Sequence, residues 1–273
     1  MPSLVPLFLF GFAALVPVLF AVLGARRAVA FAYVAGWLFL PVATIDLPLV
    51  EYDKAAAIAL GCLVGVVLVD LSTLLAFRPG FVDLGIVALC VSPLASSISN
   101  ELGAYDGFAN AVNMTLLWGV PWLLGRLYLG SREGATLLAR AVVWGGLAYV
   151  PLCAWELRMS PQLHAQLYGY YAHASGFTQV VRFGGWRPTV FMHHGLMVGM
   201  FMATAALCAL ALVRAEPRRR YLARRPSSRP GSSRRRCCAS RAGRSGSCSS
   251  ASVSGGSACA RLHGLPTSSS RSP

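Results

Sequence analysis

The stretch LVPLFLFGFAALVPVLFAVL, residues Leu4–Leu23, carries no charge and is long enough to cross a bilayer as a helix. It exceeds the apolar region of a signal peptide, no basic residue precedes it, and Arg26 and Arg27 follow it. We therefore expect it to remain as a membrane span. The whole chain has this character, because 56% of its residues are hydrophobic and only 12% are charged, against about 25% charged in a typical soluble domain.

Six more apolar runs of similar length follow along the chain, and Asp70 and Pro93 interrupt two of them. Asp70 is expected at a helix terminus or as a polar partner within the bundle, with a proton-relay role as the alternative. Pro93 predicts a kink or a re-entrant segment. The predicted fold class is therefore all-α, a polytopic transmembrane helical bundle of about seven spans. The six runs are Ala28–Ile45, Ala55–Phe77, Phe81–Ile98, Phe108–Gly125, Leu137–Trp155 and Val190–Val213.

The charges between the runs indicate how the bundle is oriented. With seven spans, every arginine-rich connection falls on one side of the membrane, beginning with Arg26 and Arg27 and ending with Arg214 and the basic C-terminal segment. Because basic loops stay in the cytoplasm, the N-terminus is expected outside and the C-terminus inside. The predicted domains are a transmembrane helical domain, 1–214, with an outer loop, 156–188, and a basic tail, 215–273.

The basic tail carries most of the formal net charge of +14. Thirteen of the 24 basic residues follow position 216 and no acidic residue does. Such a composition buries no core and predicts disorder. Two interpretations remain open: a cytoplasmic tail that contacts anionic lipid or nucleic acid, or an out-of-frame translation of a GC-rich gene. In the second case the natural protein continues as further spans. We expect the lipid bilayer as partner and no specific nucleic acid.

The outer loop holds most of the chemically useful side chains. Ser160 and Pro161 predict the start of a short amphipathic helix at the membrane interface. Its apolar positions recur at helical spacing, and His164 and Tyr168 fall on another face. Ionisable groups at membrane depth are functional candidates, so the candidate site is this loop together with the residues that follow it up to His194. Its members are Glu156, Arg158, His164, Tyr168, Tyr170, Tyr171, His173, Arg182, Trp186, Arg187, His193 and His194.

The run RFGGWRPTVFMHHG, Arg182–Gly195, resembles the R-x-x-G-x-R-P-x-G-x-F-x-H-P-N pattern of the bacterial O-antigen ligase and polymerase family. The resemblance implies transfer of a glycan from an undecaprenyl-diphosphate carrier, outside the bacterial inner (plasma) membrane and without cofactor or metal. Arg182, with Arg187 second, would engage the diphosphate, and Arg158, Tyr168 and Trp186 would complete substrate binding. At His194 and Gly195 the chain departs from the pattern, which has Pro-Asn there.

The family's essential histidine lies in a later and larger periplasmic loop, which does not occur before the basic tail. The resemblance therefore implies that part of the active site is missing, and His164 or His173 would have to act as general base. Simpler interpretations stay open beside it. The arginines could be interface anchors, the tyrosines an aromatic belt, and the histidines a polar helix face. The whole chain could also be a small transporter or a non-catalytic membrane protein fragment.

Overall fold

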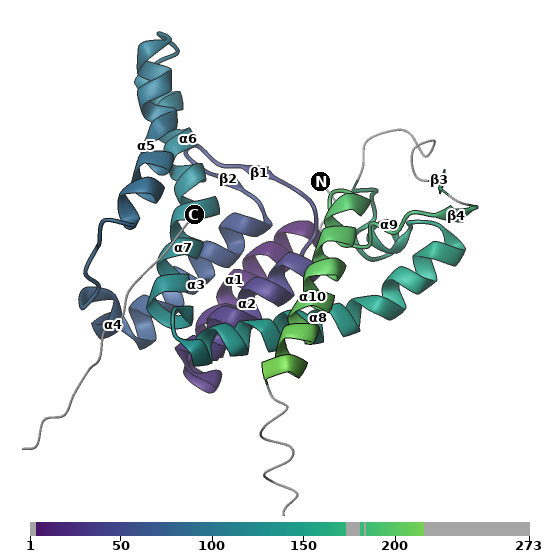
Figure 1. Cartoon of the computed structure of the whole chain (residues 1–273). Helices are drawn as coiled ribbons and strands as arrows, with labels where there is room; N and C mark the ends of the chain where they lie inside the picture. Colours follow the sequence, from purple (N-terminus) through teal and green to yellow (C-terminus); the bar gives the residue numbers. More distant parts are fainter. Residues whose placement is uncertain (1–3, 173–180, 183, 216–273) are drawn as a thin grey trace, which may run out of the picture. The chain divides into compact units, whose positions relative to one another are not determined.

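The computed structural model describes residues 4–172, 181–182 and 184–215, and these are mostly helical, as predicted (Figure 1). The predicted basic tail, 215–273, lies outside the described residues except for Ala215. The helices of the first half are α1 (Leu4–Leu23), α2 (Ala25–Phe39), α3 (Lys54–Val69), α4 (Leu71–Leu75) and α5 (Asp83–Ser99).

The second half contains a winding helical run and two long helices. From residue 104 to 129 the chain is helical without a break, but two π-helical turns, η1 and η2, interrupt the α-helical geometry. The elements of this half are α6 (Ala104–Met114), η1 (Thr115–Gly119), α7 (Val120–Leu124), η2 (Gly125–Leu129), α8 (Arg132–Met159), α9 (Leu163–Tyr168) and α10 (Gly195–Ala215).

Two short antiparallel hairpins depart from the all-α prediction. Strand β1 (Ile45–Asp46) pairs with β2 (Glu51–Tyr52), and β3 (Val181–Arg182) pairs with β4 (Gly185–Trp186). Both lie in connections that the sequence assigned to the outer side. Each strand has only two residues. The alternation of apolar and polar residues that predicts a strand cannot be recognised over so short a stretch.

Three helices, α1, α8 and α10, are long and apolar enough to cross a membrane. The prediction of about seven spans is not confirmed, since α3 and α5 are apolar but shorter. Asp70 explains the short α3, because it is the residue between α3 and α4. Its carboxylate accepts hydrogen bonds from Thr73 Oγ1 at 2.7 Å and Tyr128 Oη at 3.1 Å.

Helices α1, α2 and α3 pack through glycines. A methyl group at Gly65 would lie 2.6 Å from the ring of Phe20, and one at Gly61 would lie 3.0 Å from the carbonyl oxygen of Ala13. The Gly61-x-x-x-Gly65 spacing therefore allows α3 to approach α1 closely, as in membrane helix pairs. This packing forms the first of two buried clusters.

The second buried cluster lies where α2, α8, α9 and α10 meet. Helix α8 packs against both α10 and α2 (Figure 1). Away from these contacts the two long helices present large apolar side chains outward, and Trp144, Met200 and Val213 are each more than 70% exposed. Apolar exposure of this extent is expected of a surface that contacts lipid.

The predicted interfacial helix is present but shorter, and its exposed face differs from the expected one. Helix α9 ends at Gly169, which has a φ of +82°. Ser160 is the C-terminal cap of α8, not the N-cap of α9. The side chains of His164 and Tyr168 are buried, whereas Leu167 is exposed. The polar face of this helix points into the protein, because His164 and Tyr168 form hydrogen bonds there with backbone carbonyl and amide groups.

Candidate functional site

Glu156 is the centre of the candidate site. It lies in the last turns of α8 and its side chain is fully buried. One carboxylate oxygen accepts the backbone N–H groups of Thr189 and Val190, each at 2.8 Å, and the other accepts that of Leu163 at 3.2 Å. A buried carboxylate that accepts backbone amides replaces its lost hydration in this way. Glu156 thus fixes the connection into α10 and the start of α9 to α8.

The connection into α10 is strained at Val190. This residue has a φ of +51°, a region that β-branched residues rarely adopt. The next residue is held from two sides: Phe191 N–H donates to Tyr149 Oη at 3.2 Å, and the carbonyl of Phe191 accepts Lys54 Nζ at 3.3 Å. Strain of this kind persists only where surrounding contacts enforce it, and it concentrates at functional sites.

Lys54, the only lysine of the chain, is 2% exposed. Its ammonium donates to the carbonyls of Trp37 and Phe191 and lies 5.0 Å from the centre of the Trp37 ring. Burial lowers its pKa to about 8, against a smaller opposing effect of Asp53. Lys54 therefore places a cation, held by carbonyls and an aromatic face, directly beneath the strained connection.

Arg187 lies across the first residue of α10. A methyl group at Gly195 would come within 2.6 Å of Arg187 Cγ and 2.7 Å of its Nε. Only glycine leaves this space, so the half-buried Arg187 side chain is positioned by the helix start. His194 Nδ1 accepts the N–H of Leu196 at 3.2 Å. The two residues that depart from the family pattern, His194 and Gly195, therefore shape the entry into α10.

His193 is exposed beside this arrangement. Partial burial and, second, the Lys54 charge lower its pKa, and Asp53 has the opposite effect. Asp53 in turn lines a cavity of about 410 Å³ between the start of α3 and the α5–α6 pair, with both apolar and polar side chains in its lining. Its hydrogen-bonding lining consists of Glu51, Asp53, Ser96, Ser97, Asn110 and Asn113. Asp53 in the cavity lining is thus the sequence neighbour of Lys54, which contacts the connection at the carbonyl of Phe191.

His164 and Tyr168 are tied to the backbone that leaves α2. His164 Nε2 accepts the N–H of Val42 at 3.1 Å, and its Nδ1 lies 2.8 Å from the carbonyl of Tyr170. This pattern requires a neutral ring protonated on Nδ1. Tyr168 Oη donates to the carbonyl of Phe39 at 2.6 Å, and its ring is 1% exposed. In this geometry both residues stabilise the fold, and neither presents a polar atom to a ligand.

The remaining predicted residues are distributed around the connection. Arg158 is exposed at the end of α8, and Trp186 is half-buried in β4. Arg182 lies in β3, opposite Gly185, and its side chain is outside the described residues, as is all of His173. Gly184, with a φ of +76°, serves the hairpin turn, which is a sufficient reason for a glycine at this one position.

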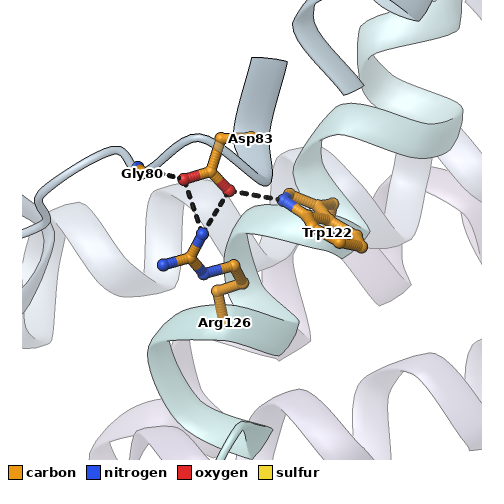
Figure 2. A network of polar contacts seen from close by, with 4 residues as sticks. All are labelled: Gly80, Asp83, Trp122 and Arg126. Atoms are coloured by element: carbon orange, nitrogen blue, oxygen red, sulfur yellow. Dashed lines mark hydrogen bonds and ion pairs between the residues drawn. The ribbon is translucent and has the colours of Figure 1, made fainter. Parts of the chain in front are cut away.

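A second polar network lies in the apolar body (Figure 2). Both carboxylate oxygens of Asp83, at the start of α5, accept Arg126 Nη1 at 2.5 Å. Trp122 Nε1 donates to the same carboxylate at 2.8 Å, and the N–H of Gly80 does so at 2.7 Å. The side chain of Asp83 is 8% exposed. The network joins α5 to the π-helical turn η2 and neutralises an acid that would be costly to bury alone.

Sequence reasoning missed the structural roles of Glu156, Tyr149 and Lys54. The sequence contains a clue to two of them. Glu156 directly follows an apolar run, and Lys54 is the one lysine of a chain whose other basic residues are arginines. Nothing in the pattern pointed to Tyr149. Among the described residues, no group of three or more histidines, cysteines and acids is placed to hold a metal ion.

Comparison of the chain with models of known families, with curated proteins and with solved structures found no match. The resemblance to O-antigen ligases and polymerases therefore rests on the residues of the 182–195 motif.

Proposed function

We propose that this chain is an inner-membrane protein that binds a lipid-diphosphate-linked glycan on its outer side, as an O-antigen ligase or polymerase does. The observation that carries the proposal is the fixed, cationic connection into α10. Arg187 is positioned against Gly195, and Lys54 is buried beneath the strained Val190–Phe191 backbone. In the proposed arrangement seven spans cross the membrane, with the N-terminus outside and the C-terminus in the cytoplasm.

The charge of the connection suits a diphosphate. Residues 181–194 contain two arginines and two histidines and no acid, and with the buried Lys54 they outnumber the Glu156 carboxylate that binds the same backbone. A guanidinium binds two phosphate oxygens at once, and the buried Lys54 charge adds to the positive potential with little screening by water. Bound diphosphate would also raise the lowered pKa of His193, because a nearby negative charge favours the imidazolium.

The cavity of about 410 Å³ next to Asp53 is the proposed place of the sugar. Its carboxylates, amides and hydroxyls offer both donors and acceptors for sugar hydroxyl groups. A second cavity of about 500 Å³ shares Glu51, Ser97, Asn110 and Asn113 with it and is bordered by the ring of Tyr105. Together they give room for more than one sugar unit.

In the proposed reaction an acceptor hydroxyl attacks the anomeric carbon while the bond to the diphosphate oxygen breaks, with inversion. Arg182 and Arg187 stabilise the negative charge that develops on the leaving diphosphate. A base must take the hydroxyl proton, and His173 and His164 are the candidates in this chain. For His164 this role requires release of the Val42 amide from Nε2.

Binding of the carrier tests this proposal. The full chain in nanodiscs of neutral lipid would be titrated with undecaprenyl diphosphate, and bound carrier would be counted by native mass spectrometry. We expect Arg182→Ala and Arg187→Ala each to weaken binding at least ten-fold. Arg78→Ala, which removes an exposed arginine outside the site, is the matched control. Equal binding by all four proteins would contradict the proposal.

A small transporter is the second candidate function, favoured by the Asp83–Arg126 pair and the adjoining π-helical turns (Figure 2). Buried ion pairs and π-helical turns in membrane proteins often mark transport pathways. This function predicts that proteoliposomes dissipate an imposed pH gradient and that Asp83→Asn slows the dissipation. No difference from empty liposomes would remove proton transport from consideration.

A further inference from the structure

A second basic site lies at the other end of α8 from Arg158. It is a groove of about 960 Å³ formed where α1 ends, α2 and α8 begin and α10 ends. All three helices that are long enough to cross a membrane reach this groove with one end. Its lining residues include Arg26, Arg27, Arg132, Glu133, Arg140 and Leu212.

Positive charge dominates this groove. Four arginines and one carboxylate line it, which leaves an excess of three positive charges. The carboxylate of Glu133 pairs with Arg26 at 3.3 Å, but the two side chains are 87% and 48% exposed. An ion pair this exposed contributes little, so it does not cancel the field of the cluster. A large excess of one charge around a concave surface concentrates counter-ions there.

The adjoining helix ends reinforce the same field. Helix α2 begins at Gly24 without a side-chain cap or an acidic residue in its first turn, and Arg26 and Arg27 stand there instead. The N-terminal end of a helix carries a partial positive charge. Cations in the first turn are therefore unfavourable, and an anion held between them and the helix end relieves that cost.

The basic tail of the chain does not suit this groove, since residues 217–273 hold 13 arginines and no acid. The groove also carries the apolar side chains of Leu23, Leu137 and Leu212 beside its arginines. A ligand with an anionic head and an apolar body matches both features at the end of three candidate spans. We propose that this groove binds the phosphate headgroup of an anionic phospholipid.

Lipid binding by matched variants tests the proposal. The full chain in neutral detergent would be titrated with phosphatidylglycerol or phosphatidylcholine, and bound lipid would be counted by native mass spectrometry. The variant Arg27→Gln/Arg132→Gln is expected to lose roughly 30-fold in phosphatidylglycerol affinity, from about five-fold for each arginine. The single variant Arg27→Gln, with an expected loss of about five-fold, is compared with the control Arg78→Gln, which removes the same charge outside the groove and leaves the tail unchanged.

The opposite change gives a second, independent measurement. Glu133→Gln releases Arg26 and removes a negative charge, so it is expected to strengthen phosphatidylglycerol binding several-fold. The proposal is supported if the groove variant loses more phosphatidylglycerol affinity than the control and Glu133→Gln gains affinity. Equal loss in groove and control variants would show that binding follows overall charge and would overturn it. Displacement of the lipid by millimolar inorganic phosphate would overturn it too, because the site would then be one for free phosphate.

Discussion

At the scale of single residues, Glu156 holds α8, α9 and the connection into α10 together through three backbone amides. We expect Glu156→Gln to lower the free energy of unfolding by about 1–3 kcal/mol, because its NH₂ group faces amide donors that then lack an acceptor. Thermal unfolding in detergent measures the change. Glu133→Gln, on the same helix with an 87% exposed side chain, is the control. Equal melting temperatures for the two variants would contradict the role of Glu156.

Lys54 predicts a pH dependence of stability. Its pKa in the folded protein is about 8, below the ordinary 10.5, so the unfolded chain binds more protons between these values. Stability from this residue therefore rises as the pH increases from about 8 to about 10.5, by up to about 3 kcal/mol. Below pH 8 the buried charge carries its full cost.

The measurement is the difference in melting temperature between the natural chain and Lys54→Met at pH 7 and at pH 10. Other titrating groups are common to both proteins, so they cancel. At pH 10 the melting temperature of the natural chain should be higher, relative to that of Lys54→Met, than it is at pH 7. A constant difference, or one that falls, would show that Lys54 is hydrated or otherwise compensated.

The sequence placed His164 and Tyr168 on the polar face of a helix but could not say which way that face turns. In water a polar face points outward, whereas here it meets the backbone groups of Phe39, Val42 and Tyr170. Phe39 and Val42 lie more than a hundred residues away from this helix in sequence. No periodicity in a six-residue helix reveals such a partner, so the direction of the face was beyond prediction.

At the scale of elements, the glycines of α3 determine how closely α1 approaches it. We expect Gly61→Ala/Gly65→Ala to destabilise the protein by about 1–3 kcal/mol, because the added methyl groups press on the Ala13 backbone and the buried Phe20 ring. Gly11→Ala, which meets open space in α1, should be neutral or stabilising. Chemical or thermal unfolding of both variants compares them. If Gly61→Ala/Gly65→Ala unfolds at the same temperature or denaturant concentration as the natural chain, α1 and α3 are not held at close distance by these glycines.

The end of a helix could be predicted from the sequence where a single residue interrupts the apolar pattern. Asp70 divides the third apolar run into α3 and α4, as an acid among apolar residues suggests. The π-helical turns η1 and η2 and the hairpins at 45–52 and 181–186 were not predictable. A π-helical turn bonds residues five apart instead of four, and in a run that is apolar on most sides the resulting shift of the pattern over five residues is not recognisable.

At the scale of the whole molecule, composition established a helical, membrane-type chain, and the structure supports three candidate spans. The seven spans predicted from the apolar runs are not confirmed, since only these three of the described helices combine the required length and hydropathy. Helix α8 relates the two proposed sites: Arg132 at its start lines the basic groove, and Arg158 at its end neighbours the outer connection. Its 28 residues extend about 42 Å, more than the roughly 30 Å of a bilayer core.

The most direct test asks whether α8 crosses the membrane between these two sites. Single cysteines would be introduced as Glu133→Cys and Arg158→Cys in a chain whose eight natural cysteines are replaced by alanine. An impermeant thiol reagent would then be applied to intact and permeabilised cells. We predict labelling of the cysteine at 158 in intact cells, and of the cysteine at 133 only after permeabilisation. Labelling of both positions in intact cells, or of position 133 alone, would contradict the proposed arrangement.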